Sequence, residues 1–195
     1  DPASSTDIFD VKGDVSSVLA ALGIDISKTQ ITRDAPAWFH PGRSGVIRLG
    51  PKTVLAQFGE LHPATAKLMD VSGAVSAFEV FLSDLPAEKR RTRARPPLTL
   101  QSLLPVRRDF AFLVDAKTPA GDIVKAVLGA DKAMVAGVQV FDLYEGKGIA
   151  DGKKSIAVEV TLQPSDKTLT DAEIDSLAGK IVAEVKRATG GEIRS

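Results

Sequence analysis

The stretch that decides the fold is residues 138–162, which read VQVFDLYEGKGIADGKKSIAVEVTL. Two β-rich runs, 138–145 and 155–162, flank a connector with three glycines, at which a positive φ costs little. In the second run, apolar side chains at 156, 158, 160 and 162 alternate with small or polar ones, which is the pattern of a strand with one buried face. The stretch therefore predicts a β-hairpin with a long loop.

The segment before the hairpin predicts a strand followed by a helix. Residues 107–115 are rich in β-forming side chains, and Thr118 is expected to cap the helix with Pro119 at its first position. The apolar stripe of this helix is expected to consist of Ile123, Val124, Val127 and Leu128.

The segment after the hairpin predicts a second helix and a short closing strand. Thr170 and Glu173 have the spacing of a capping box, and apolar residues then recur at helical spacing as far as Gly190. Residues 192–195 suffice only for an edge strand. The order β-α-β-β-α-β over residues 97–195 predicts an α+β, ferredoxin-like domain, in which two helices cover one face of a four-stranded antiparallel sheet.

The other face of this predicted sheet is expected to be open. Period-two alternation along the first hairpin strand places Asp142 and Tyr144 on the open face. The same alternation turns Phe141 and Leu143 toward the helices.

Residues 1–86 predict a separate, mostly antiparallel sheet with two helices. A short extended lead at 8–11 is expected to enter a helix that ends at Gly23. Further on, a short helix is expected from Pro63, because proline suits the first helical position. The expected strands, separated by glycine- and proline-containing turns, are 29–33, 45–49, 53–61 and 74–81.

Residues 87–96 join the two domains and carry five basic residues against one acid. Like charges, a closing proline and no apolar periodicity predict an extended, protease-sensitive linker. Two interpretations stay open: a basic strap that contacts RNA phosphates, or a solvated crossing between domains.

Composition limits the class of protein. The chain has 195 residues, 25 basic and 25 acidic side chains, two histidines and no cysteine. The balanced charge restricts any nucleic-acid contact to local patches, and the missing cysteines exclude disulfides and thiolate metal sites. No apolar run is long enough to span a bilayer and no targeting pattern opens the chain, so we expect a cytoplasmic protein. The first residue is Asp1 rather than Met, which suggests a fragment of a longer polypeptide.

The sequence contains no recognisable catalytic or metal-binding motif. His40 and His62 each precede a proline, and we expect them to end strands by hydrogen bonding rather than to catalyse. Trp38 is expected in the core of the first domain or at a subunit contact. A self-sufficient enzyme is therefore disfavoured.

Tyr144 is the sequence's best candidate for a binding residue. An aromatic ring with a polar tip can stack on a nucleic-acid base, and the nearby candidates for polar contacts are Asp142, Lys147, Lys153 and Lys154. Arg107 and Arg108 have two equal interpretations, because guanidinium groups serve both uses. They are expected either to form an ion pair with Asp109 or Asp142, or to clamp a phosphate.

Several motifs carry a family resemblance. The runs at 107–109, 141–146, 152–155 and 168–173 resemble the ferredoxin-fold anticodon-binding domain at the C-terminus of bacterial phenylalanyl-tRNA synthetase β-subunits. The runs at 7–13, 40–44 and 59–63 resemble a part of the same subunit, a degenerate class II synthetase-like module that has lost catalysis.

The resemblance implies a division of labour. A separate α-subunit joins phenylalanine to tRNA with ATP and magnesium, in an (αβ)2 heterotetramer, and this part of β binds no cofactor. It braces α and holds the anticodon region of tRNA(Phe), with Tyr144 at the family's anticodon-stacking position. The upstream region with the family's editing site is absent here, so editing is not implied. The alternative is a ferredoxin-like regulatory module that binds a small ligand or a protein partner without RNA.

Overall fold

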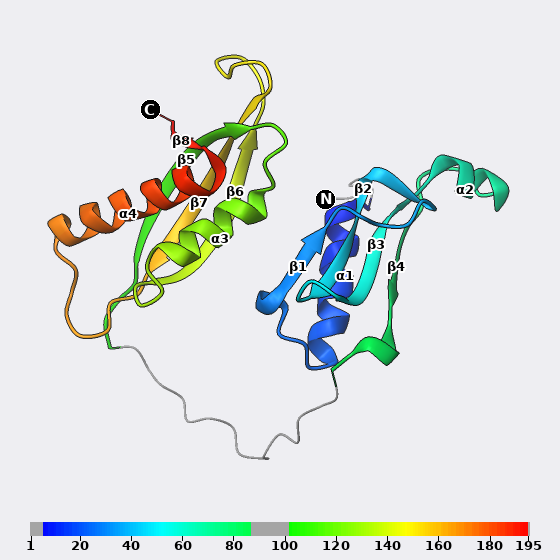
Figure 1. Cartoon of the computed structure of the whole chain (residues 1–195), viewed down its shortest axis with the longest axis horizontal. Helices are drawn as coiled ribbons and strands as arrows, with labels where there is room; N and C mark the ends of the chain where they lie inside the picture. The colour runs from blue at the N-terminus through cyan, green and yellow to red at the C-terminus, as the bar shows by residue number, and fades with distance from the viewer. Residues whose placement is uncertain (1–5, 87–101, 195) are drawn as a thin grey trace. The chain divides into compact units, whose positions relative to one another are not determined.

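The computed structural model describes residues 6–86 and 102–194 (Figure 1). The chain divides into two compact units, residues 1–95 and 96–195. The predicted linker at 87–96 lies outside the described residues. Among the residues described, no helix has both the length and the apolar character needed to cross a membrane.

The second unit is a four-stranded antiparallel sheet with the strand order β6-β7-β5-β8. Its elements in chain order are β5 (Val106–Asp115), α3 (Ala120–Ala130), β6 (Val135–Tyr144), β7 (Lys153–Leu162), α4 (Asp171–Thr189) and β8 (Glu192–Ile193). This order and pairing are those of the split βαβ arrangement. The predicted α+β class and ferredoxin-like fold are confirmed.

Both helices of the second unit pack on the same face of its sheet (Figure 1). Ile156 and Val158 of β7 and Phe112 of β5 are fully buried, and they share one core with Ile123 of α3 and Ile181 of α4. Burying a side chain of this size contributes about 1.5–3 kcal/mol. The helices therefore leave the opposite face of the sheet open.

The ends of the two helices differ in how well the sequence predicts them. Thr170 accepts a hydrogen bond from the main-chain nitrogen of Glu173, and the Glu173 carboxylate accepts one from that of Thr170, so the capping box is confirmed. In α3 the prediction was wrong. Pro119, with an extended ψ of 137°, is itself the N-cap, and no side chain caps the helix. The buried stripe includes Ala126, whereas Leu128 is 40% exposed, because the stripe that faces the sheet runs through 123, 126 and 127.

The first unit is a second antiparallel sheet, with the order β1-β2-β3-β4. Its elements are α1 (Ile8–Ala21), η1 (Ile26–Lys28), β1 (Thr29–Thr32), β2 (Phe39–Leu49), β3 (Thr53–Leu61), α2 (Pro63–Leu68), β4 (Ser76–Val80) and η2 (Leu82–Asp84). Helix α1 buries Val15 and Leu19 against a core that contains Leu55 and Phe58 of β3. The predicted strands and helices of this unit are present, with shifted boundaries at three of the four strands and at α1.

The predicted extended lead at 8–11 is wrong, because these residues are the first turn of α1. Asp7 accepts hydrogen bonds from the main-chain nitrogens of Phe9 and Asp10, and the Asp10 carboxylate accepts one from the nitrogen of Asp7. Asp at both positions of a capping box starts a helix as a Ser/Thr-Glu pair does. Strand β2 begins at Phe39 rather than at residue 45, with a break in its register between Phe39 and Ser44.

The two histidines have structural roles at strand ends. Nδ1 of His62 accepts a hydrogen bond from the main-chain nitrogen of Ala64 and caps α2 just after β3. Nδ1 of His40 accepts one from Gly42 at 3.0 Å. Trp38 is 50% exposed, so of its two predicted positions the core is wrong, and a subunit contact stays a prediction.

Candidate nucleic-acid interface

A β-bulge in β6 determines which face of the sheet carries Tyr144. Val138 and Val140 lie opposite the buried Val160 and Val158, on the helix-covered face. The pairing then skips Phe141, so that Asp142 lies opposite Ala157 and Tyr144 opposite Ser155. Strict alternation from Val140 would have put Tyr144 on the covered face, and the extra residue reverses this.

The bulge also changes the surroundings of the neighbouring apolar residues. We predicted that Phe141 and Leu143 pack toward the helices, but neither belongs to the core, and they are 55% and 53% exposed. Phe141 is the residue that the pairing skips, and Leu143 lies opposite Ile156 near the end of an edge strand. The prediction is therefore wrong for Phe141. Leu143 lies on the predicted, helix-covered face, but it is not buried there.

The Tyr144 side chain makes two contacts and still has 38% of its surface exposed. Its hydroxyl donates a hydrogen bond to the main-chain oxygen of Lys147, with 3.0 Å between the two oxygens. The guanidinium carbon of Arg194 lies over the ring, 5.5 Å from its centroid. A cation at this distance from an aromatic face is attracted to the ring. The ring thus lies at the surface, between its own hairpin loop and a charged side chain.

Arg194 is the contact that the sequence did not indicate. Its main-chain nitrogen donates to the oxygen of Ala111 on β5, two strands away from β6. Tyr144, Ser155, Leu113 and Glu192 form one row of paired residues across the sheet, and Arg194 follows two positions after Glu192, on the same face. Only the strand order brings Arg194 near Tyr144, which is 50 positions away in the chain.

The centre of the open face is acidic or paired rather than basic. Arg107 lies 3.6 Å from the carboxylate of Glu159, so our prediction of Asp109 or Asp142 as its partner is wrong. The pairing of Asp109 with Glu159 and of Asp142 with Ala157 places both aspartates on this same face. Such a surface suits the stacking and edge recognition of bases, and phosphates have to be met at its rim.

The predicted basic residues divide between the two faces. Lys153, exposed at the start of β7, shares the open face with Ser155, and Lys147 is exposed in the hairpin loop beside the ring. Lys154 pairs with the buried Val114 and is only 7% exposed, and Arg108 pairs with Val160. The structure therefore brings Arg107, Asp142, Lys147 and Lys153 to the open face or its rim with Tyr144, and it places Arg108 and Lys154 on the other face.

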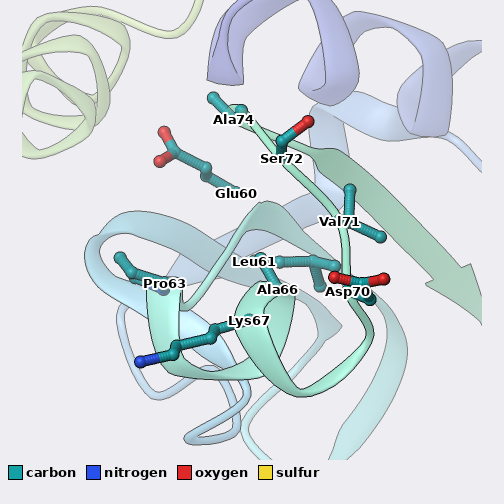
Figure 2. Close-up of a pocket in the computed structure, with 10 residues that line it drawn as sticks. Glu60, Leu61, Pro63, Ala66, Lys67, Asp70, Val71, Ser72 and Ala74 are labelled. Carbon is teal, nitrogen blue, oxygen red and sulfur yellow. The ribbon is translucent and has the colours of Figure 1, made fainter.

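The first unit carries a pocket of about 580 Å³ between the end of β3, α2 and residues 70–74 (Figure 2). Glu60 lines it, and two nitrogens of the Arg43 guanidinium donate to the Glu60 carboxylate at 2.6 and 2.9 Å. These hydrogen bonds hold the pKa of Glu60 below its usual range. Because Arg43 already occupies this carboxylate, we assign no ligand to the pocket.

The second unit is an α+β domain of the ferredoxin-like class: helices cover one face of its antiparallel sheet, and a tyrosine and charged side chains lie on the other. Residues 103–194 match the family described as "Ferredoxin-fold anticodon binding domain". Residues 1–82 match the "Phenylalanyl tRNA synthetase beta chain CLM domain".

The chain belongs to the phenylalanine–tRNA ligase β-subunit family. It is 53% identical over 190 residues to the β-subunit of Bradyrhizobium diazoefficiens, which is 97% of this chain and 24% of that protein. It is 50% identical over 195 residues to that of Rhodospirillum rubrum (100% and 24%) and 54% identical over 188 residues to that of Rhodopseudomonas palustris (95% and 23%). The chain thus spans about a quarter of the length of these relatives, and the predicted family resemblance is confirmed.

Proposed function

We propose that the second unit binds the anticodon region of tRNA(Phe) on its open sheet face, and that a base of the anticodon loop stacks on Tyr144. The observation that carries the proposal is the half-exposed ring on the one sheet face that the helices leave free. Sequence-specific RNA recognition acts mainly on single-stranded loops, whose bases splay out and stack on aromatic side chains.

The polar side chains around Tyr144 suit different parts of the RNA. The Asp142 carboxylate only accepts hydrogen bonds, so it suits a base edge that presents N–H donors. Lys147 and Lys153 lie at the rim of the open face, where they can contact phosphates away from the carboxylates of Asp109 and Glu159. The neutral overall charge fits this arrangement, since base contacts rather than a broad basic field supply the recognition.

In the whole ligase, we propose that residues 1–86 are a non-catalytic synthetase-like module that braces the α-subunit within an (αβ)2 heterotetramer in the cytoplasm. Aminoacylation then takes place on α with ATP and magnesium. Within residues 6–86 and 102–194, no three His, Asp or Glu side chains are grouped as a metal site requires.

The test is Tyr144→Ala in the full-length β-subunit assembled with α. Loss of one base stack costs about 1–3 kcal/mol, so the KM for tRNA should rise roughly five- to a hundredfold. Phenylalanine activation, measured by pyrophosphate exchange without tRNA, should not change. Phe141→Ala is the matched control, because Phe141 is an exposed aromatic in the same strand that the pairing skips. An unchanged KM for tRNA in the folded Tyr144→Ala enzyme would refute the proposal.

A further inference from the structure

We infer that the hairpin loop positions the Tyr144 ring, with Gly146 and the main-chain carbonyl of Lys147 as the positioning groups. The inference rests on the proposed function, since it concerns how the stacking platform is held. It assigns a role to the glycines of the loop, which the sequence identified only as turn residues.

The loop presents the Lys147 carbonyl through a tight turn. The main-chain nitrogen of Ile149 donates to the oxygen of Gly146 at 2.9 Å, which closes a four-residue turn from 146 to 149. Gly148, the third residue, has a φ of +91°, as a type II turn requires. The oxygen of Lys147, the second residue, takes no part in closing the turn, and it accepts the hydrogen bond from the Tyr144 hydroxyl.

This hydrogen bond fixes the tip of the ring but not its plane. The ring is attached at its Cβ and anchored at its hydroxyl, and both points lie on the axis about which the ring plane turns. Rotation about that axis therefore needs a separate restraint. The hydroxyl proton is also used within the chain, so the tip can only accept a hydrogen bond from RNA, and the ring face remains for stacking.

Gly146 and Arg194 supply the missing restraints. A Cβ built on Gly146 would lie 3.2 Å from the Tyr144 hydroxyl and 3.7 Å from Cε2, which lies off that axis, so one edge of the ring packs on glycine backbone. Arg194 covers a face of the ring at 5.5 Å from the centroid. Together these contacts hold the ring in one orientation before RNA arrives, which reduces the ordering cost of binding.

The inference predicts that Gly146→Ala acts through Tyr144. The added methyl must push the ring tip by a few tenths of an ångström, because contacts of 3.2–3.3 Å are closer than ordinary van der Waals separation. Tyr144→Phe removes the hydrogen bond and keeps the ring. In the assembled full-length ligase, each change should raise the KM for tRNA about two- to tenfold, less than Tyr144→Ala does.

A double-mutant cycle separates positioning from general damage to the loop. In a Tyr144→Ala background, Gly146→Ala should have no further effect, within about twofold, because the ring that it displaces is gone. Gly137→Ala is the matched control: Gly137 lies in β6, the strand of Tyr144, at an ordinary φ, and the atom nearest to its new Cβ is 4.0 Å away.

A second readout does not depend on RNA. Tyr144 is the only tyrosine of this chain, so selective labelling of tyrosine isolates its aromatic NMR signals in the 195-residue protein. Gly146→Ala should shift these signals and Gly137→Ala should leave them in place. If Gly146→Ala leaves both the signals and the KM unchanged while Tyr144→Ala raises the KM, positioning is refuted and the stacking proposal stands. If Tyr144→Ala has no effect, the proposed function itself fails.

Discussion

Lys153 and Lys154 are neighbours in sequence on opposite faces of the sheet, and exchanging each for alanine gives a matched test of the interface. Lys153 is exposed on the open face, and Lys154 is 7% exposed on the covered face. We expect Lys153→Ala to weaken tRNA binding with little effect on stability. Lys154→Ala should lower stability with little effect on tRNA binding.

The size of each effect follows from the position of the side chain. Removing one contact to a phosphate of a single-stranded loop changes the slope of log K against log salt by about 0.7, which at roughly 0.15 M salt corresponds to about a fourfold loss of affinity. Lys154 buries its aliphatic stem beside Val114, so truncating it should cost about 1–2 kcal/mol of unfolding free energy. For a domain of this size, that lowers the Tm by roughly 4–16 °C.

The assay is a salt titration of tRNA binding by the assembled ligase, paired with thermal unfolding of the 195-residue chain for each variant. Wild type and Phe141→Ala give the reference slopes. The reasoning is refuted if Lys154→Ala reduces the salt slope as much as Lys153→Ala does, or if Lys153→Ala leaves the slope unchanged. Either result would mean that the faces assigned from the β5–β7 pairing do not describe how RNA meets this sheet.

Two further predictions concern stability. Gly59 has a φ of +151°, and a Cβ there would lie 2.5 Å from Ser44 Cβ and 2.6 Å from the Arg43 oxygen. Gly59→Ala should therefore destabilise the first unit by about 1–3 kcal/mol or more. Gly13→Ala, in α1 with no atom within 4 Å of the new Cβ, should instead stabilise it by about 0.5–1 kcal/mol, and equal effects in denaturant unfolding would contradict the steric argument. Lys167, together with Thr170, lowers the pKa of Glu173 from an ordinary 4.5 to about 2. Because the folded-state pKa is the lower one, the ionised carboxylate stabilises the fold above about pH 4.5, and this contribution is lost as the pH falls toward 2. The Tm difference between wild type and Glu173→Gln should therefore be present at pH 7 and vanish near pH 2, and a difference that does not depend on pH would be inconsistent with the ion pair.

The sequence predicts most of the second unit because its elements are specified locally. The alternation in β7 and the capping box at Thr170 and Glu173 each depend on residues a few positions apart, and both are confirmed. The errors at Thr118 and at residues 8–11 are also local. Proline at 119 fits either an N-cap or a first helical position, and aspartate starts a helix as readily as it occupies a loop.

The composition of the candidate site, in contrast, depends on pairings between distant strands. The predicted alternation has the right face for Asp142 and Tyr144, but continued back along β6 it would put Val138 and Val140 on the open face, whereas they lie opposite Val160 and Val158 on the covered one. The sequence contains no local mark of the bulge that separates the two halves of this strand. The order β6-β7-β5-β8 brings the face of Arg194 to Tyr144 and pairs Arg107 with Glu159 rather than with Asp109 or Asp142. The sequence by itself therefore determined the fold and the key tyrosine, whereas only the tertiary structure decided which charges surround that tyrosine, since strand register and order are set by burial of the whole core.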